Sequence, residues 1–368
     1  MQIAIIGTRG LPANYGGFET CVDHTAKEWA SQGHKVIVYC RENHYKNQVT
    51  NYHGVSLRYT KSVPLKGIDT LSNTLISILD LIIFKRTYKT VHLYNSGNGI
   101  FIPLLRLFGR KVYVSVDGVE WKREKWGFIP KMIHKLGAYM CVKFSNKVIV
   151  DNREVFHIYK NKFSKQTTII EYGAKFIENS EFSGDTLSKF NLVSKHYFLF
   201  VGRFVPEKGV HKLIETYLKL KTDKPLVIIG GDTSSTDYTD KIEMYSANNE
   251  NIIVTGFLYN EAYEELLSNA YLYVSASELE GTSPSLLAAL GAKVCTLVNG
   301  IKENIQTLRG AGYVFKENDL NDLLKLWQNC EEDSSFVSAM ATKGYEFAKQ
   351  NYSWKNISKQ YLELFQEH

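Results

Sequence analysis

The sequence is poor in cysteine, and the cysteines it has are badly spaced for cross-linking. Five cysteines are spread over 368 residues, and no two of them form a CxxC pair. This usage argues against a disulfide framework and a cysteine zinc site, and it is typical of reduced intracellular thiols. The chain also starts directly with the apolar segment Gln2–Ile6, so we expect no signal peptide and a cytoplasmic protein.

The sequence also lacks an apolar run long enough to cross a bilayer. Its strongest candidate, LSNTLISILDLIIF at 71–84, is too short and too often interrupted by polar residues. Basic residues follow it at Lys85, Arg86 and Lys89. Two interpretations stay open, namely a helix lying in the interface of an anionic membrane, or a core helix with a solvated end.

Acidic residues are scarce in the first half of the chain. Residues 1–175 hold 26 Lys and Arg against 12 Asp and Glu, a net charge of +14, whereas residues 176–368 hold 18 against 26, a net charge of −8. A basic half favours contact with a polyanion. Because we find no recognisable nucleic-acid-binding module, we expect no nucleic-acid partner. The inner face of the cell membrane fits better, with the protein bound to it peripherally.

Apolar segments of strand type alternate with helical patterns along the whole chain. The length and the hydrophobic content of 44% suit two soluble domains. Between the first two strands, Phe18, Val22, Ala26 and Trp29 recur at helical spacing, and Gly33 follows as a stop signal. Strands are expected in two series, at 2–6, 35–39, 91–94, 111–115, 147–150 and 168–171, and then at 197–201, 226–229, 251–255, 271–274 and 293–297.

This alternation predicts an α/β fold with parallel sheets, in which each half is one Rossmann-like domain and the two halves face each other. We place the domains at 1–175 and 176–350. The polar stretch 179–195 is expected to be a linker, and a terminal helix is expected at 353–366.

The first strand is not followed by the GxGxxG pattern of dinucleotide-binding proteins. It leads instead into GTRGLPANYGG at 7–17, and the second strand ends in Tyr39-Cys40-Arg41 without an acidic residue. A dinucleotide dehydrogenase is therefore disfavoured. The glycines still allow the backbone to approach a ligand, and the helix that follows offers free amides to a phosphate. The alternative is a tight turn without a functional role.

The most informative segment is FVGRFVPEKG at 200–209. An apolar strand ends in Gly202 and Arg203, Lys208 follows five residues later, and Gly209 precedes a new helix. Two cations beside backbone amides at the start of a helix suit a diphosphate. The alternative is a surface loop with solvated cations.

A second loop, SELEGTSPSLLAALG at 277–291, places two carboxylates between a strand and a helix. Pro284 suits the first turn of that helix, where free amides near Ser285 and Leu286 can receive phosphate oxygens. A carboxylate in the loop can accept hydrogen bonds from sugar hydroxyls. Glu278 and Glu280 have no supporting His or Asp cluster, so we expect no metal.

A third segment, VDGVEWKREKW at 116–126, follows a strand of the basic half. Asp117 ends that strand, and it is either a catalytic carboxylate that faces a reacting hydroxyl or a capping residue before Gly118. Aromatic and basic residues alternate after it, which suits stacking on a sugar and contact with a lipid diphosphate, or else plain surface charge. The residues concerned are Glu120, Trp121, Lys122, Arg123, Lys125 and Trp126.

Taken together, GTRGLPANYGGFET, VDGVEWKREKWG, VGRFVPEKG and EGTSPSLL resemble the retaining glycosyltransferases of family 4, which have the GT-B fold. The similarity is greater to the bacterial rhamnosyltransferase-like branch that builds surface polysaccharides. It spans nearly the whole chain and ends with an FSW-like tail at 352–354. The resemblance implies two Rossmann-like domains and a C-terminal helix, 351–368, that packs back toward the first domain.

The resemblance also implies roles for individual residues. Arg203 and Lys208 would hold the donor diphosphate, and Glu280 would face the donor sugar. Asp117 would complete the catalytic set. The expected donor-binding residues are Gly16, Gly17, Glu207, Gly281, Thr282, Ser283, Pro284, Ser285, Leu286 and Ala288. The expected acceptor-binding residues are Glu120, Trp121, Lys122, Arg123 and Lys125.

The implied activity is metal-independent transfer of a sugar, rhamnose or a similar hexose, with retention of anomeric configuration and without a cofactor. The donor would be a nucleotide diphosphate sugar, dTDP-rhamnose or a UDP-sugar, bound mainly by the acidic domain. The acceptor would be a lipid-diphosphate-linked saccharide, bound by the basic domain. An epimerase or a phosphorylase fits less well, because we find no motif for a pyridoxal-linked lysine.

One position departs from the family pattern. Family 4 enzymes usually carry a second Glu, separated from the first by seven residues, where this chain has Ala288. By resemblance that Glu binds the ribose hydroxyls of the nucleotide, so its loss removes a charge-assisted hydrogen bond of roughly 1.5–3 kcal/mol. A catalytically silent GT-B protein that binds a nucleotide sugar or a glycan is therefore the alternative.

Overall fold

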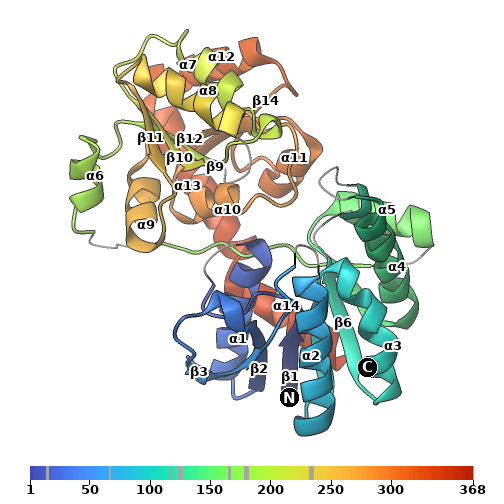
Figure 1. The fold of residues 1–368 in the computed structure, drawn as a ribbon. Coiled ribbons are helices and arrows are strands. Elements are labelled where there is room, and N and C mark those ends of the chain that lie inside the picture. Colours follow the sequence, from blue (N-terminus) through green and yellow to red (C-terminus); the bar gives the residue numbers. More distant parts are fainter. Residues whose placement is uncertain are drawn as a thin grey trace. The chain divides into compact units, whose positions relative to one another are not determined.

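The computed structural model describes residues 1–13, 16–65, 68–116, 118, 120–122, 127–164, 167–177, 182–231 and 236–367. The chain divides into two compact units (Figure 1). Unit 1 comprises Met1–Tyr172 and Trp354–His368, and unit 2 comprises Gly173–Ser353. Each unit has its own parallel sheet with helices on both faces, which confirms the expected α/β fold of two Rossmann-like domains.

The described residues of unit 1 form an eight-stranded sheet in the order β3-β4-β2-β1-β5-β6-β7-β8, in which only β3 runs antiparallel to its neighbour. The strands are β1 Gln2–Ile6, β2 Lys35–Arg41, β3 Asn51–Tyr52, β4 Val55–Thr60, β5 Thr90–Tyr94, β6 Lys111–Val116, β7 Lys147–Val150 and β8 Thr168–Ile169. The helices are α1 Gly17–Ser31, α2 Asp69–Phe84, α3 Ile102–Leu107, α4 Phe128–Phe144, α5 Arg153–Phe163 and α14 Trp354–Gln366, with short 3₁₀ turns η1 Glu42–His44, η2 Ser96–Phe101 and η3 Glu120–Lys122.

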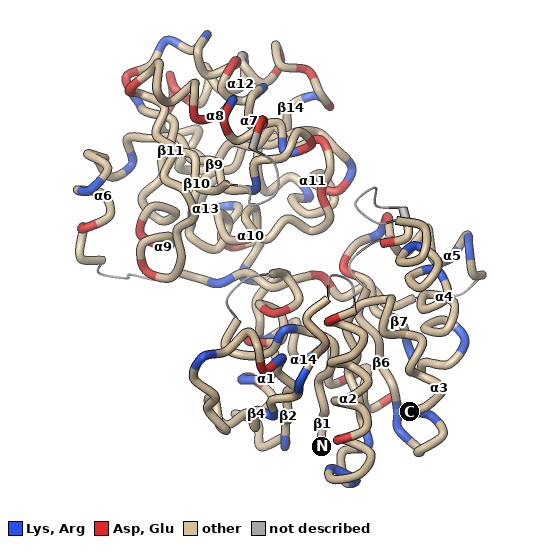
Figure 2. Tube along the Cα trace, in the orientation of Figure 1, with Lys and Arg blue, Asp and Glu red and all other residues tan. Residues whose placement is uncertain are grey.

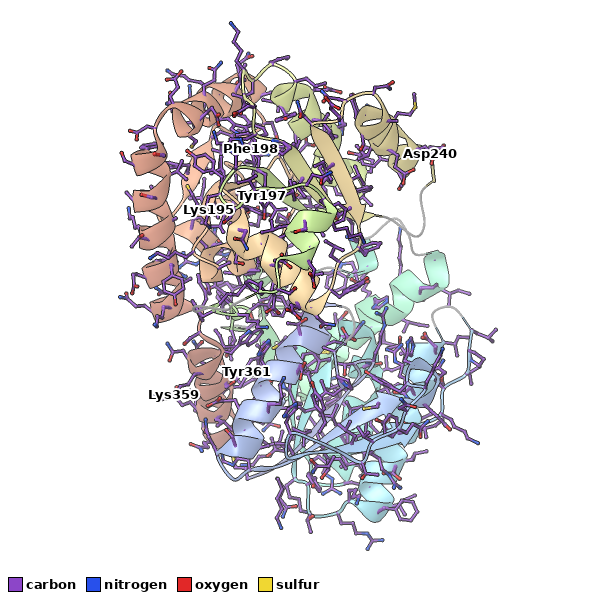
Figure 3. The ribbon with its side chains drawn as sticks, turned by 90° about the vertical axis from the view of Figure 1, so that its left-hand side faces the viewer. Lys195, Tyr197, Phe198, Asp240, Lys359 and Tyr361 are labelled. Carbon is purple, nitrogen blue, oxygen red and sulfur yellow. The ribbon has the colours of Figure 1, made fainter. Side chains whose placement is uncertain are left out.

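The sheet of unit 1 has a hydrophobic core on each face. Helices α2, α3, α4 and α5 cover one core, and α1 and α14 cover the other. The last helix is held there by specific contacts, since the Trp29 indole donates to the Ser358 carbonyl at 3.0 Å and Tyr361 is buried beside it. Figure 3 shows Tyr361 on the inner side of α14 and Lys359 on its outer side. The C-terminal helix therefore packs on the N-terminal unit, as the sequence predicts.

The described residues of unit 2 form a six-stranded parallel sheet in the order β11-β10-β9-β12-β13-β14. The strands are β9 Phe198–Arg203, β10 Leu226–Gly231, β11 Ile252–Gly256, β12 Leu272–Ser275, β13 Cys295–Asn299 and β14 Tyr313–Phe315. The helices are α6 Asp185–Lys189, α7 Val210–Tyr217, α8 Thr236–Ala247, α9 Asn260–Asn269, α10 Pro284–Gly291, α11 Lys302–Leu308, α12 Leu320–Glu332 and α13 Ser334–Asn351, with one 3₁₀ turn η4 Pro206–Lys208.

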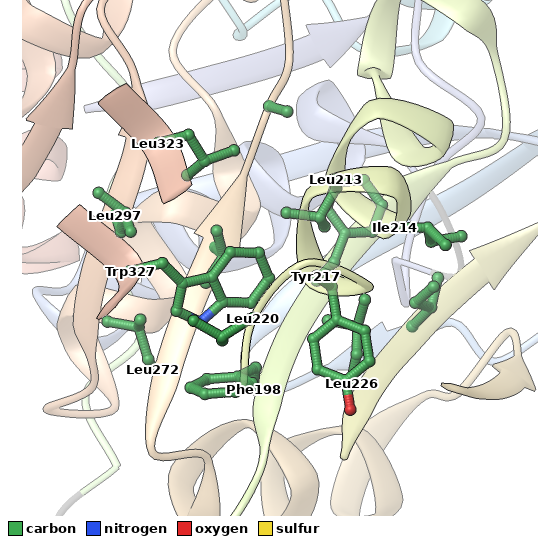
Figure 4. Close-up of a cluster of buried hydrophobic side chains, with 14 of the residues drawn as sticks. Phe198, Leu213, Ile214, Tyr217, Leu220, Leu226, Leu272, Leu297, Leu323 and Trp327 are labelled. Atoms are coloured by element: carbon green, nitrogen blue, oxygen red, sulfur yellow. The ribbon is translucent and has the colours of Figure 1, made fainter. Parts of the chain in front are cut away.

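The core of unit 2 is built around aromatic rings from three elements (Figure 4). Trp327 of α12 meets Phe198 of β9 edge to face at 5.1 Å between ring centroids, and it lies 6.0 Å from the ring of Tyr217 on α7. Edge-to-face pairs of this kind stabilise a core beyond the area they bury. They fix β9 and α7, which are the two elements that flank the Arg203–Lys208 loop.

Four elements lie outside the strand and helix pattern expected from the sequence. β3 with β4 and the three-residue β14 extend the two sheets, and α6 lies inside the stretch 179–195 that we expected to be a linker. That stretch belongs to unit 2, where the Glu265 carboxylate accepts hydrogen bonds from the Thr186 and Leu187 amides. The linker prediction was therefore wrong over 185–189, because side-chain contacts hold a helix too short to show a period.

Helix α2 covers the segment 71–84. One of its faces packs into the core through Ile78, Leu81 and Ile82, whereas Leu79, Ile83 and Phe84 are exposed. The membrane-interface interpretation of this segment therefore stays a prediction. Among the described residues, no helix has the length and hydropathy of a membrane span.

Candidate functional site

In the sheet of unit 2, the order in which successive strands are added reverses between β9 and β12. Strands β10 and β11 are added on one side of β9, and β13 and β14 are added beyond β12. In an open parallel sheet, the crevice at the carboxyl ends of two such strands is the usual ligand site. Here the two loops at that point are 204–209, which follows β9, and 276–283, which follows β12. They are the two loops that the sequence singled out.

The loop after β9 is held against the loop after β12 by backbone contacts. Gly209 has φ of 64° and lies directly against the Ala276 backbone, where any side chain would collide with the Ala276 carbonyl. The Glu278 amide donates to the Glu207 carbonyl at 2.9 Å. Glu207 therefore joins the two loops through its backbone, while its side chain is exposed.

Lys208 and Glu280 form an ion pair across these two loops. Lys208 Nζ lies 2.5 Å from Glu280 Oε1, and the two side chains are only 18% and 9% exposed. Arg203 ends β9 and is exposed at the same edge. The structure thus brings Lys208 and Glu280 into contact and places Arg203 at the carboxyl end of the adjoining strand β9. A phosphate that binds Lys208 must therefore compete with the Glu280 carboxylate for the ammonium group.

A second ion pair, Lys212 with Glu278, lies beside the first. Lys212 is on α7, one turn beyond the Lys208 loop, and its side chain is about one third exposed, as is that of Glu278. The sequence analysis noted Glu278 only as a weak metal candidate. Its observed role is to tie the β12 loop to α7.

Helix α10 begins at the edge of the same crevice. Ser283 is its N-cap residue and Pro284 stands in the first turn. The Ser285 hydroxyl lies 3.0 Å from the Tyr273 hydroxyl and 3.2 Å from the Ser283 hydroxyl. Leu286 is buried in the core, so only its backbone amide is suited to a polar ligand. These groups fit the predicted phosphate contact at a helix start.

The other predicted donor residues of this loop lie around the same helix start. Thr282 is buried, Gly281 is half-buried, and Ala288 is half-buried on α10 one turn beyond Pro284. The Ala288 methyl offers no hydrogen bond. The departure from the family pattern is therefore located beside the crevice.

A cavity of about 550 Å³ opens next to the Arg203 loop, at the carboxyl ends of β10 and β11. Its walls include Phe204, Gly231, Gly256 and Phe257, and helix α8 contributes Glu243. Sequence reasoning missed this cavity. The signal was present as glycines at the ends of two neighbouring strands, but their pairing depends on the strand order.

The glycine loop of unit 1 occupies the corresponding switch point, between β1 and β5. Gly16 is the N-cap residue of α1, with φ of 112°, and Gly17 lies near the Tyr172 ring. The Glu19 carboxylate folds back to the loop and accepts a hydrogen bond from the Arg9 amide at 3.0 Å. A carboxylate near a helix N-terminus is favourable, because it meets the positive end of the helix dipole.

The acceptor-binding prediction is only partly covered by the structure. Asp117, Arg123 and Lys125, together with the Lys122 side chain, lie outside the described residues. Glu120 is buried. Trp121 is also buried, with its ring against Tyr159 and Phe163, and Lys162 Nζ lies 4.5 Å from the ring centroid. Assigning Trp121 to stacking on a sugar was therefore wrong, because its ring already forms part of the core.

Comparison with known proteins gives a consistent assignment. Residues 187–347 match the family described as Glycosyl transferases group 1, and residues 1–175 match a domain of unknown function, DUF1972. O-antigen chain mannosyltransferase C of Escherichia coli is 23% identical over 362 residues, which cover 94% of each chain. An uncharacterized glycosyltransferase of Methanocaldococcus jannaschii is 25% identical over 257 residues, and this match covers 67% of the present chain but only 64% of the relative.

Solved structures agree on the fold. Sucrose-phosphate synthase of Thermosynechococcus elongatus superposes with a TM-score of 0.81 at 17% identity, covering 100% of this chain and 98% of that one. HepE of Anabaena, solved with UDP-glucose, gives a TM-score of 0.78 at 14% identity over 99% and 98% of the two chains.

The two sheets, the returning C-terminal helix and these superpositions define a GT-B protein. More specifically, its C-terminal unit is similar to the group 1 glycosyltransferases over residues 187–347, and residues 1–175 match DUF1972. These matches support the resemblance to glycosyltransferases that the sequence motifs indicated. Placement in the rhamnosyltransferase-like branch stays a prediction.

Proposed function

We propose that the protein is a nucleotide-sugar-dependent glycosyltransferase whose donor diphosphate binds at the carboxyl edge between β9 and β12. The observation that carries this proposal is the convergence of Arg203, Lys208 and Glu280 at the switch point of unit 2. The match of residues 187–347 to the group 1 glycosyltransferases supports it.

In this proposal the two cations stabilise the diphosphate as it leaves the anomeric carbon. Arg203 and Lys208 are placed where negative charge develops, so they favour the transition state over the ground state. Amides at the start of α10 receive phosphate oxygens, and Glu280, released from Lys208, accepts hydrogen bonds from the sugar hydroxyls. Gly16 and Gly17 are assigned to the donor by resemblance alone.

The nucleoside part of the donor fits the cavity at the ends of β10 and β11. The cavity adjoins the Arg203 loop through Phe204, and the Phe257 ring forms part of its wall. The exposed ring of Tyr259 is stacked with that of Phe257, 6.3 Å away and tilted by 14°. Aromatic faces of this kind bind bases without reading their identity.

The finer features of the reaction rest on resemblance. We infer retention of anomeric configuration, no metal, and transfer of rhamnose or a similar hexose from dTDP-rhamnose or a UDP-sugar. The acceptor is a lipid-diphosphate-linked saccharide for a bacterial surface polysaccharide, bound by unit 1 with Asp117, Glu120, Lys122, Arg123 and Lys125 at a peripheral site on the inner membrane face. The O-antigen mannosyltransferase relative and the neighbour solved with UDP-glucose support this range of substrates.

The test is mass-spectrometric detection of transfer, with a panel of nucleotide sugars and polyprenyl-diphosphate-linked GlcNAc or glucose acceptors. We expect a product with at least one pair, and a loss of about 100-fold or more in kcat/KM for Lys208→Ala. Lys224→Ala is the matched control, because Lys224 also forms a largely buried ion pair, with Glu331 at 2.7 Å. Undiminished transfer by Lys208→Ala would contradict the assigned role.

Ala288 favours a second candidate, a GT-B protein that binds its ligand without transfer. Restoring the carboxylate separates the two functions. If the protein is an active enzyme, Ala288→Glu should change donor affinity by at most about 10- to 150-fold, the worth of one charge-assisted hydrogen bond. A large gain from a near-zero rate would favour the silent protein instead.

A further inference from the structure

Helix α4 exposes a continuous apolar face. Phe128, Ile129, Met132, Leu136 and Tyr139 lie on one side of the helix, and their exposed fractions range from 46% to 78%. Side chains four residues apart stack along a helix, so these five form one stripe. A contiguous apolar stripe of large side chains marks an interaction site rather than ordinary surface.

The orientation of α4 is fixed by its opposite face. A side chain at Gly99 of η2 would collide with the Gly137 carbonyl of α4, and one at Gly137 would collide with the Ser96 carbonyl of η2. Ala138 and Cys141 are fully buried in the core beside them. The helix therefore has two apolar faces, one against the sheet and one exposed, and it cannot rotate to bury the second.

The charges on α4 are all of one sign. Lys131, Lys135 and Lys143 border the stripe, and the segment 127–144 contains no Asp or Glu (Figure 2). Lys143 Nζ lies 5.6 Å from the centroid of the Tyr139 ring, so the cation and the stripe are in contact. A helix with large apolar side chains on one face and lysines beside them suits an anionic lipid surface.

We propose that the outer face of α4 docks on an anionic membrane, with Phe128, Ile129 and Met132 inserted below the headgroups and the lysines on the phosphates. This deepens the proposed function, whose acceptor is lipid-linked, by naming the surface that meets the bilayer. It also replaces the interfacial helix considered at 71–84, since α2 carries Asp80 beside its exposed Leu79 and pairs that carboxylate with Arg58.

A second copy of the chain is the less favourable occupant. A two-fold contact through α4 places the same patch against itself. The lysines of one copy then face the lysines of the other, without a carboxylate on either helix to pair with them. Headgroup phosphates remove this repulsion, so charge complementarity selects the membrane.

The experiment is co-sedimentation of the purified full-length chain with vesicles of phosphatidylcholine, with and without 30% phosphatidylglycerol (a composition of roughly physiological charge density). We expect binding to the anionic vesicles that weakens with salt. The variant Ile129→Gln/Met132→Gln/Leu136→Gln should lose at least 10-fold in partitioning, and Lys131→Gln/Lys135→Gln about 30-fold, from about fivefold per lysine.

Two controls make the result specific to α4. Met244→Gln changes an exposed methionine of α8 in unit 2, which is 64% exposed, and should bind vesicles like the wild type. Leu79→Gln/Ile83→Gln changes the outer face of α2 and should also bind like the wild type. Circular dichroism confirms that each variant is folded.

The proposal is overturned if the wild type does not bind anionic vesicles, if the triple α4 variant binds as well as Met244→Gln, or if only the α2 variant loses binding. It is also overturned if sedimentation velocity shows that the wild type is a dimer, that the triple α4 variant is a monomer, and that neither protein binds vesicles. Because the assay contains no donor or acceptor, its outcome is independent of sugar transfer. If the chain binds vesicles but transfers no sugar, the membrane-docking inference stands and the proposed function is contradicted.

Discussion

At the scale of single residues, the pairing of Lys208 with Glu280 controls what the candidate site binds. The two charges are 2.5 Å apart and largely shielded from water, so each is the other's main partner. In the proposed function, a diphosphate binds Lys208 only after the Glu280 carboxylate has released it. We expect the hydroxyls of the donor sugar to compensate for this exchange, because they give Glu280 new hydrogen-bond donors.

This exchange predicts opposite effects of one substitution on two ligands. Glu280→Gln removes the competing charge, so a nucleoside diphosphate without sugar should bind about 3- to 10-fold more tightly. The nucleotide sugar should not gain in the same way, because the amide is a weaker acceptor for its hydroxyls. Calorimetric titration of both ligands checks this. Equal changes for the two would contradict separate roles for Lys208 and Glu280.

His92 provides a residue-scale prediction about stability. The side chain is fully buried, its Nε2 lies 2.8 Å from the Ser115 hydroxyl, and burial lowers its pKa from 6.5 to about 3. The unfolded chain therefore binds the proton more readily, and the stability due to neutral His92 is lost as the pH falls below 6.5 toward 3. Between pH 7 and pH 5 the expected loss is about 2 kcal/mol.

Denaturant unfolding at several pH values measures this loss. His92→Gln keeps a partner for Ser115 but does not titrate, so its stability should fall less steeply over the same range. If the variant and the wild type show the same slope between pH 7 and pH 5, then other groups account for the acid sensitivity.

At the scale of elements, α14 completes unit 1 from the far end of the chain. Phe365 and Tyr361 are buried against Trp29 and His92, and the Tyr113 hydroxyl donates to the Phe365 carbonyl at 3.2 Å. A helix that supplies this much of one core is a structural part of the domain, although more than 180 residues separate it from the rest.

Truncating the Phe365 side chain should therefore destabilise unit 1. Phe365→Ala is expected to cost about 3–5 kcal/mol, the usual loss for a buried aromatic ring. Lys359→Ala is the matched control on the outer side of the same helix, where the side chain is 74% exposed. Denaturant unfolding of the full chain gives both values. A loss within about 0.5 kcal/mol of the control would contradict this packing.

The long elements could be predicted from the sequence, whereas the short ones could not. α1 has a clear helical period and β1 and β7 are apolar segments of strand length, and the structure places all three at or near the expected bounds. β14 and α6 have too few residues for a period to appear, and tertiary contacts specify them. The same reason explains Trp121, since a buried aromatic and a ligand-stacking aromatic look alike in a sequence.

At the scale of the whole molecule, the candidate site could be predicted in its parts but not in its internal pairing. Arg203, Lys208 and Glu280 were identified by loop chemistry and resemblance. The ion pair between the last two joins loops separated by a whole series of strands and helices, so it depends on β9 lying next to β12. The cavity beside Phe257 depends likewise on β10 lying next to β11.

The division of the chain into a basic and an acidic half also corresponds to the two structural units. The basic first half of the sequence makes up most of unit 1, which carries the lysines of α4, and the acidic half contains the Lys208–Glu280 site. An acidic domain repels an anionic donor at long range. In the proposed function, recognition of the diphosphate would therefore depend on local cations, and we assign this role to Arg203 and Lys208.

The most direct measurement is calorimetric binding of UDP, dTDP, GDP and ADP to the wild type, Arg203→Ala, Lys208→Ala and the control Lys224→Ala. The account predicts that the wild type binds at least one of these nucleotides. Arg203→Ala and Lys208→Ala should each weaken that binding by about 10- to 150-fold, while Lys224→Ala leaves it unchanged. Wild-type affinity in the Lys208→Ala protein, or no binding of any nucleoside diphosphate to the folded wild type, would contradict a donor site between β9 and β12.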